Sequence, residues 1–554
     1  MAERAPITAE GAVALGASVG IDVPSDLAGG VAARLNAVAT AAERWRPVVG
    51  RDVVPFVDFE LPRPEAPGGG AAGLRTGKAA SASAAASGGP AGAAGPTERT
   101  WPARTADDAG DLFDLAASIR ERRLSPVALA EEKLRAIAEL NGELIAYLTV
   151  AGERALADAE RAEHELARGV YRGPLHGVPI AHKDLIPTKG IRTTYHTAAF
   201  KDNVPDEDAP IVKRLARAGT VLLGKANTLE LGSGDGDVFG LARNPWDPAR
   251  QVGGSSSGSA VAVATGLAAA ATGTDAGGSI RIPAAFCGIV GVKPTAGLVE
   301  VSKGTNGISV TGPMTRTTLD AAIMLEVMTG EAGLAERVTG DVAGLTVGVP
   351  VDWLDTPLED EIAGTMQHAV EVLRGLGASV REVRLPHASA SEVLGGVVTH
   401  VDNFGKYRFL LEQGAQLGKF VHELLLAAEL YPAAAYRLGQ RLRRLMVEEV
   451  RAAHETADIL ITPMVPYRAA RLGETELRIG ATTVNPRTGQ GRFTRLSNLT
   501  GFPSLSVPTG LDSNGMPLSV QLHGRPFEEA VILSAARAIE LNNDKRSARP
   551  RFHA

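Results

Sequence analysis

The pattern of apolar and polar positions divides the chain into long amphipathic segments and short apolar runs. Apolar side chains recur at helical spacing over residues 111–121, 125–141 and 151–168, and these segments are predicted to be helices. Short apolar runs of strand length follow around Lys183 and at 221–225, 459–465 and 504–508. Strands that alternate with helices predict an α/β fold, in which a sheet is sandwiched between helical layers.

Two further regions are helical in pattern from end to end. Near the N-terminus, one helix is predicted to begin at Ile7–Glu10 and a second at Pro24–Leu27, the latter continuing to Ala42. Residues 387–457 also have helical spacing and contain no strand signal. The main sheet is therefore expected to carry a helical insertion and an N-terminal helical appendage.

Residues 63–104 differ in composition from the rest of the chain. They are mainly Gly, Ala, Ser and Pro, without a period and with almost nothing that could form a core. Such a segment is typical of a flexible linker. We therefore predict three parts in this 554-residue chain: a helical segment over 1–62, a linker over 63–104 and a main domain over 105–545.

Composition and charge exclude several classes of protein. A content of 44% hydrophobic and 22% charged residues is typical of a soluble globular protein. The net charge of −6 offers no electrostatic footprint for nucleic acid or an anionic membrane. No secretory signal and no apolar run of membrane-spanning length are apparent, and a single cysteine fits a reducing compartment. We expect a cytoplasmic protein that binds neither nucleic acid nor membrane.

Two glycine–serine clusters mark the candidate site, one opening at Ser255 and the other closing at Ser279. Glycine lets backbone approach a bound group and lets successive N–H groups point at one spot, as a nucleophilic serine requires. The residues after Ser279, Ile280 to Pro283, are predicted to be a strand. Cys287 is expected to lie in an apolar strand as a small buried side chain rather than a nucleophile.

These segments resemble the amidase signature family of serine hydrolases. The resemblance rests on three motifs: the GGSS cluster at Gly253, the segment Gly273-Thr-Asp-Ala-Gly-Gly-Ser-Ile-Arg-Ile-Pro283, and Gly291-Val-Lys-Pro-Thr295. It covers residues 110–540, roughly the predicted main domain. It implies a mixed sheet flanked by helices, with the helices of 387–457 forming walls of the substrate cleft. Residues 1–62 resemble, much more weakly, the small helical subunits that accompany some amidases and amidotransferases; an ordinary helical hairpin packed on the main domain is an equal alternative.

The resemblance also implies a role for each site residue. Ser279 would be the nucleophile, Ser255 its partner after a cis peptide bond, and Lys183 the base. Backbone amides leading into the nucleophile would form the oxyanion hole, namely those of Ala276, Gly277, Gly278 and Ser279. Asp275, Arg281 and Ser256 would support this loop.

The chemistry of such a site depends on the protonation of lysine. Serine is a poor nucleophile at neutral pH unless a base removes its proton. Lysine titrates near 10.4 in water, and burial lowers that pKa. Apolar neighbours on both sides of Lys183 fit such burial. His182 is adjacent, but side chains alternate along a strand, so we expect it to point elsewhere and to be structural.

Two other motifs are weaker. Gly254–Gly258 matches the Gly-x-Ser-x-Gly nucleophile elbow, but residues 244–248 before it are predicted to be loop rather than the required strand. Gly219–Lys225 approaches a phosphate-binding loop, yet Ala226 replaces the Ser or Thr that binds magnesium. The histidines form no paired metal-ligand spacing. No cofactor and no metal are expected.

Three functions remain open. The first is hydrolysis of a carboxamide C–N bond in a small amide substrate. The second is cleavage of a carbamate, urethane or ureido bond by the same groups. The third is a glutamine-hydrolysing component that supplies ammonia within an amidotransferase. The sequence identifies neither the substrate nor the oligomeric state. A homodimer is one of the states that it leaves open.

Overall fold

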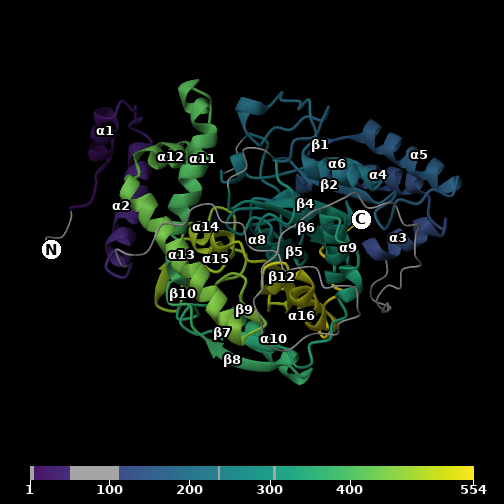
Figure 1. The fold of residues 1–554 in the computed structure, drawn as a ribbon. Helices are drawn as coiled ribbons and strands as arrows, with labels where there is room; N and C mark the ends of the chain where they lie inside the picture. Colours follow the sequence, from purple (N-terminus) through teal and green to yellow (C-terminus); the bar gives the residue numbers. More distant parts are fainter. Residues whose placement is uncertain (1–4, 50–110, 235–237, 303–306, 554) are drawn as a thin grey trace, which may run out of the picture.

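The computed structural model describes residues 5–49, 111–234, 238–302 and 307–553. Over these ranges the chain forms one large mixed sheet with helices on both faces, together with helices at its edge (Figure 1). The predicted linker over 63–104 and the boundary at 105 lie outside the described residues. The predicted α/β architecture is confirmed.

The sheet is mixed, and its parallel parts lie near its two ends. In the described ranges eleven strands are ordered β1-β3-β2-β4-β6-β5-β12-β13-β9-β7-β8. Strand β2 pairs in parallel with β3 and β4, and β7 with β8 and β9, whereas the other neighbours are antiparallel. The strands are β1 Tyr147–Val150, β2 Pro179–Lys183, β3 Val221–Ala226, β4 Ala270–Asp275, β5 Val290–Lys293, β6 Val310–Thr315, β7 Thr346–Pro350, β8 Ser379–Val383, β9 Ile459–Pro463, β12 Ser504–Leu511 and β13 Pro517–His523, with β10 Leu477–Ile479 and β11 Thr482–Val484 forming a separate pair.

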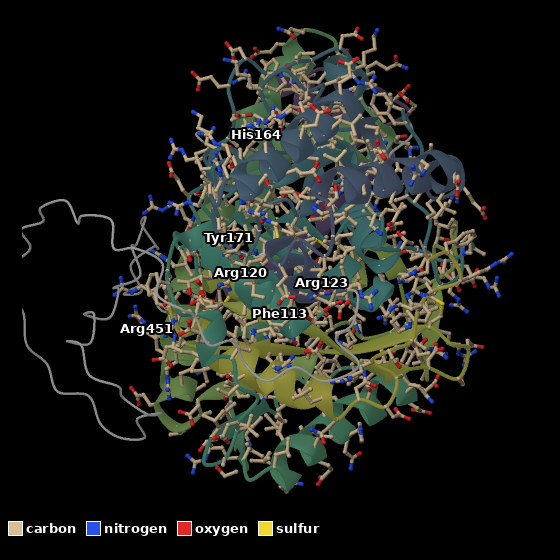
Figure 2. All side chains as sticks on the ribbon, turned by 90° about the vertical axis from the view of Figure 1, so that its right-hand side faces the viewer. Phe113, Arg120, Arg123, His164, Tyr171 and Arg451 are labelled. Carbon is tan, nitrogen blue, oxygen red and sulfur yellow. The ribbon has the colours of Figure 1, made fainter. Side chains whose placement is uncertain are left out.

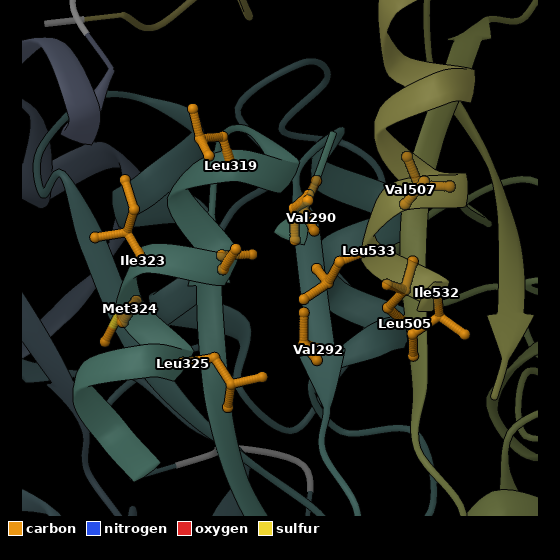
Figure 3. Packing of buried hydrophobic residues seen from close by; sticks show 14 of the residues in the cluster. Val290, Val292, Leu319, Ile323, Met324, Leu325, Leu505, Val507, Ile532 and Leu533 are labelled. Atoms are coloured by element: carbon orange, nitrogen blue, oxygen red, sulfur yellow. The ribbon is translucent and has the colours of Figure 1, made fainter. Parts of the chain in front are cut away.

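Neighbouring residues of the central strands enter different cores, as the two-residue period of a strand requires. Ile180 and Ala270 join the core that contains α9, α10 and α16, whereas Ala181 and Ala271 join the core of α4, α5, α7 and α8. Figure 3 shows part of the first core, where side chains of β5 and β12 meet those of α9 and α16. The helices around the sheet are α3 Leu112–Arg120, α4 Pro126–Leu144, α5 Gly152–Ala167, α6 Pro210–Arg217, α7 Ser257–Ala264, α8 Arg281–Cys287, α9 Thr318–Thr329, α10 Asp360–Gly375 and α16 Glu529–Leu541.

One predicted strand is wrong. The segment after Ser279 forms helix α8 instead, and Cys287 is the last residue of that helix. Pro283 is compatible with this helix because it lies in the first turn, where backbone N–H groups have no intrahelical acceptor. Short apolar runs do not distinguish a buried helix from a buried strand, and this explains the error.

The region over 387–457 is helical, as predicted. It contains α11 Leu394–Glu412, α12 Lys419–Leu430 and α13 Ala433–Thr456, and the short helices α14 Pro486–Gly489 and α15 Arg495–Thr500 follow it. The N-terminal helices α1 Ala9–Ser18 and α2 Ala28–Trp45 also form as predicted. In Figure 1 α2 lies beside α12 and α1 lies further out, and Val31 and Leu35 of α2 share a small core with Leu426 and Leu430 of α12.

Charged side chains project over the outer surface of the helices (Figure 2). On the face drawn there, the guanidinium of Arg120 on α3 lies over the ring of Tyr171, 5.3 Å from its centroid. In the described ranges, no helix combines the length and the apolar character that crossing a lipid bilayer would need.

Candidate active site

The candidate site lies where two neighbouring parallel strands end. Strand β2 ends at Lys183 and strand β4 at Asp275, so their carboxyl ends meet at the same edge of the sheet. Helix α7 begins there too, with Ser255 two residues before its first residue. The chain from Ala276 to Ser279 then passes along this edge before α8 begins. Sheet topology therefore gathers the two glycine–serine clusters and Lys183 in one place.

Lys183 is buried and held by oxygen atoms. Its Nζ is 2.8 Å from Ser255 Oγ, 2.9 Å from Thr274 Oγ1 and 3.3 Å from the Thr274 carbonyl oxygen. Burial lowers the pKa of Lys183 to about 7, against the opposing attraction of the Asp275 carboxylate. A large share of this amine is therefore uncharged near neutral pH.

Ser255 follows a cis peptide bond with Gly254, as the resemblance implied. Ser255 and Ser279 both line the same cleft. Ser256 links their two segments, because its N–H donates to the Ser279 carbonyl at 3.0 Å and its hydroxyl donates to the Thr274 carbonyl at 3.3 Å. The residues 244–248 that precede this cluster are loop, so the strand that a nucleophile elbow would require is not found at that position.

Asp275 and Arg281 form a buried ion pair next to residues 276–279, the segment that ends at the candidate nucleophile Ser279 and is here called the nucleophile loop. Arg281 Nε donates to Asp275 Oδ2 at 2.9 Å, and both side chains are fully buried. Burial alone would raise the pKa of the Asp275 carboxyl, but Arg281 and hydrogen bonds from Gly278 and Asn498 hold that pKa well below its usual range. Arg281 also donates to Ser497 and Asn498 of α15, which ties that helix to the loop.

Two of the four amides proposed for the oxyanion hole donate to Asp275 in this structure. The Gly278 N–H donates to Asp275 Oδ1 at 2.7 Å, and the Gly277 N–H donates to the same atom at 3.2 Å. Among the described residues, the N–H groups of Ala276 and Ser279 have no acceptor. An N–H that already donates to Asp275 is less available to a second acceptor. The amides of Ala276 and Ser279 are therefore better placed than those of Gly277 and Gly278 to donate to a bound oxyanion.

The cleft at this site has a volume of about 260 Å³. Helices α11 and α12 form one wall, with Tyr407 and Phe420 facing the cleft, as expected for the 387–457 region. The lining also includes residues of the nucleophile loop and Leu229. Further lining comes from the segment around α14 and α15, including Arg487 and Arg495.

The N-terminal helix α2 reaches this wall through one aromatic ring. The guanidinium of Arg34 on α2 lies 4.3 Å from the centroid of the Phe420 ring, and that of Arg487 lies 3.7 Å from it. Arg34 also lies 3.8 Å from Glu423 on α12. Phe420 thus contacts cations from the N-terminal segment and from the cleft.

The remaining candidates have structural contacts. His182 Nδ1 lies 3.0 Å from Thr272 Oγ1, and burial lowers the pKa of His182 to about 3, so it stays neutral. Burial raises the pKa of the Cys287 thiol. Lys225, from the sequence that approaches a phosphate loop, lies in strand β3 and donates to Thr188 and Thr193. In the described part of the chain, no group of three or more His, Cys, Asp or Glu side chains could hold a metal ion.

Two residues of the site were not expected from the sequence. Thr274 offers two oxygens to Lys183, and Asn498 donates to both the carbonyl and the carboxylate of Asp275 at 2.9 Å. Thr274 stands in the Gly-Thr-Asp motif and could have been found there. Asn498 lies more than 200 residues from Asp275, and only the fold brings the two together.

Comparison with known proteins identifies the family. The family model described as Amidase matches residues 128–533, more than half of the chain. The chain therefore belongs to the amidase family, a class of enzymes that hydrolyse C–N bonds.

Named relatives and solved structures match most of the chain. The chain is 34% identical over 481 residues to the A subunit of a glutamyl-tRNA(Gln) amidotransferase from Geobacter metallireducens, covering 78% of this chain and 97% of that protein. A protein of the same name from Methylococcus capsulatus is 35% identical over 484 residues, covering 79% and 98%. Among solved structures, an amidase has a TM-score of 0.72 at 32% identity, covering 78% of this chain and 100% of that one. A bacterial aryl acylamidase has a TM-score of 0.73 at 25% identity, covering 79% and 99%.

Proposed function

We propose that this chain hydrolyses a carboxamide through a seryl acyl-enzyme formed on Ser279. The observation that carries the proposal is the contact of 2.8 Å between Lys183 Nζ and Ser255 Oγ, because Ser255 lines the same cleft as Ser279. A lysine that replaces the histidine of a catalytic triad is a known variant of serine hydrolase chemistry. Membership of the amidase family supports the same reaction.

In this mechanism the neutral amine of Lys183 acts as the base. A neutral amine has two N–H groups and one lone pair, and the two oxygens of Thr274 can accept both N–H groups. The lone pair is then directed to the Ser255 hydroxyl. Ser255 passes its proton to Lys183 while it takes the proton of Ser279, and Ser279 Oγ attacks the amide carbonyl.

Charge on the carbonyl oxygen then needs fixed donors. The N–H groups of Ala276 and Ser279 would meet this oxygen, while Gly277 and Gly278 keep the loop in place through Asp275. The proton held by Lys183 returns through Ser255 to the leaving nitrogen, which departs as ammonia or an amine. Water then attacks the acyl-enzyme and gives its proton through Ser255 to Lys183, and Ser279 Oγ takes that proton back as the acid leaves.

The names of the relatives bear on which amide is cleaved. Matches named as part of an amidotransferase support the glutamine-hydrolysing alternative more strongly than the free amidase. Solved structures named as an amidase and an aryl acylamidase support hydrolysis by a self-sufficient chain. Cleavage of carbamate, urethane or ureido bonds stays a prediction.

Ammonia release by the purified full chain tests the proposal. The substrates are glutamine, simple aliphatic and aryl amides, a carbamate and a urea, without a partner protein or ATP. We expect Ser279→Ala and Lys183→Ala each to lower kcat by at least about 100-fold. Ser257→Ala is the matched control, because that neighbouring hydroxyl is buried without a partner among the described residues.

The substrate profile separates the alternatives. Activity confined to glutamine would favour the amidotransferase-type reaction, whereas turnover of simple amides would favour a free amidase. Undiminished turnover in Ser279→Ala would rule out the proposed nucleophile.

A further inference from the structure

The side chains that line the cleft are unevenly charged. Lys406, Arg487 and Arg495 are cations, and no Asp or Glu is present among the described residues of the lining. Lys406, on α11, is exposed to solvent. Arg487 is occupied in part, because it donates to the Ser233 carbonyl at 3.1 Å and lies against Phe420. Arg495 differs from both in its hydrogen bonding.

Within the described ranges, Arg495 is a cation without a hydrogen-bond acceptor. Its Nε is buried, and its guanidinium meets no acceptor among the described residues. Its Nη1 lies 3.4 Å from the point where a Cβ on Gly277 would stand, so the guanidinium lies against the nucleophile loop. An unpaired guanidinium in a partly buried position is costly, and an anionic ligand would supply the missing acceptors.

The position of Arg495 relative to Ser279 is fixed by its own helix. Thr494, the residue before it, donates its hydroxyl to the Gly277 carbonyl at 2.6 Å. Asn498 donates to Asp275, and Arg281 donates to the Thr494 carbonyl at 3.0 Å. Arg495 thus stands on the first turn of α15, which is tied to the nucleophile loop on both sides.

The other charged groups near Arg495 do not neutralise its charge, so it can interact with a ligand. Glu392 is the carboxylate that acts on Arg495, but Glu392 pairs with Arg492 at 3.1 Å. His400, which lines the cleft, has a pKa well below its usual range because of burial and of the charges of Arg495 and Arg34. His400 is therefore neutral, and the charged side chains of the described lining are all cations.

We propose that Arg495 binds a carboxylate on the acyl portion of the substrate. This inference rests on the proposed function and narrows it: the substrate is the amide of an acid that carries a second carboxylate. A free α-amino acid amide such as glutamine fits less well, because its ammonium group would find no acidic side chain in the described lining. Monoamides of short dicarboxylic acids carry a carboxylate without an ammonium group, and they match the charge of the cleft better.

Paired substrates test this preference. Succinamate and glutaramate carry the carboxylate, 4-oxopentanamide is a neutral analogue of succinamate, and glutamine adds an ammonium group. Wild type should prefer the monoamide with the carboxylate over the neutral amide by roughly 30-fold or more in kcat/KM, as expected for a buried charge-assisted contact. Arg495→Gln should bring this ratio close to one, and Arg495→Lys should restore part of it. Arg444→Gln is the matched control, because Arg444 pairs with Glu448 on the exposed side of α13, outside the lining, and should keep the ratio.

A binding measurement separates this inference from the proposed function. Calorimetry of Ser279→Ala with succinate, glutarate and neutral succinamide does not depend on turnover. Dicarboxylate binding that disappears in Ser279→Ala/Arg495→Gln upholds the inference even if no amide is hydrolysed. Hydrolysis without a preference for the anion, or a preference unchanged in Arg495→Gln, would overturn the inference and leave the proposed function standing.

Discussion

The proposed chemistry depends on the charge of a single amine. Lys183 has no exposed surface, and its hydrogen-bond partners are the hydroxyl of Ser255 and the oxygens of Thr274. Burial without a direct carboxylate contact disfavours the ammonium form, which is why its pKa falls to about 7. A base with a pKa near the working pH combines availability with basicity.

This pKa sets the pH dependence that we expect. The neutral form of Lys183 is the active one, so kcat/KM should rise about tenfold per pH unit below a pKa of about 7 and level off above it. Initial rates between pH 5 and pH 9 check this. Lys183→Arg, which keeps the charge at all these pH values, should be inactive. A flat profile across pH 7 would contradict the assignment of the base.

Stability should depend on the same group. The pKa of Lys183 is about 7 in the folded chain, whereas an unfolded lysine titrates near about 10.4. Between these values the unfolded chain binds a proton that the folded chain does not, so this group makes the free energy of unfolding rise with pH in that window. Lys183→Met should therefore remove part of the rise, which urea unfolding at a series of pH values within the window measures. An identical slope in both proteins would contradict the lowered pKa.

At the scale of elements, the nucleophile loop depends on an ion pair that has no contact with water. Asp275 receives hydrogen bonds from the loop, from Arg281 and from Asn498 of α15. A buried carboxylate that loses its partner keeps the desolvation cost without the compensating attraction. We therefore expect the pair to stabilise the nucleophile loop without taking part in the reaction.

Arg281→Met should destabilise the protein by about 3–5 kcal/mol, because it leaves the Asp275 carboxylate buried and unpaired. Arg408→Met is the matched control: Arg408 pairs with Glu412 at 2.9 Å on the same helix, and both side chains are exposed. That change should cost less than about 1 kcal/mol. Thermal and urea unfolding of both variants measure the difference, and equal losses would contradict the role given to the buried pair.

The elements also indicate how far the sequence alone could predict the structure. Long segments with a clear period, such as α4, α5 and α13, were predictable because amphipathic spacing over several turns has no strand equivalent. Helix α8 was not, since seven buried residues have no polar face to reveal a period. Ser279, Ser255 and Lys183 came from motifs, but Arg495 lies far along the chain and only the packing of α15 brings it to the loop.

At the scale of the whole molecule, the N-terminal helices are joined to the substrate cleft. Helix α2 packs on α12 through Val31 and Leu35, and Arg34 lies over Phe420 in the cleft wall. The predicted linker over 63–104 lies outside the described residues. We infer from the packing that α1 and α2 support the wall made by α11 and α12.

Val31→Asp tests this support, because it introduces a charge at a fully buried position between α2 and α12. We expect a loss of about 3 kcal/mol or more in stability and an increase in KM, since Phe420 loses its contact with Arg34. Ala33→Asp is exposed on the same helix and should change neither. An unchanged KM together with the loss of stability would show that the N-terminal helices do not affect substrate binding.

Covalent labelling tests the identity of the nucleophile most directly. The purified chain is treated with a fluorophosphonate, which modifies activated serines, and is then digested for peptide mass spectrometry. The proposed site predicts a phosphonyl group on Ser279, absent in Ser279→Ala and strongly reduced in Lys183→Ala. Modification of Ser255 or Ser256 instead, or labelling of Ser279 that is as fast in Lys183→Ala as in wild type, would contradict the proton path from Ser279 through Ser255 to Lys183.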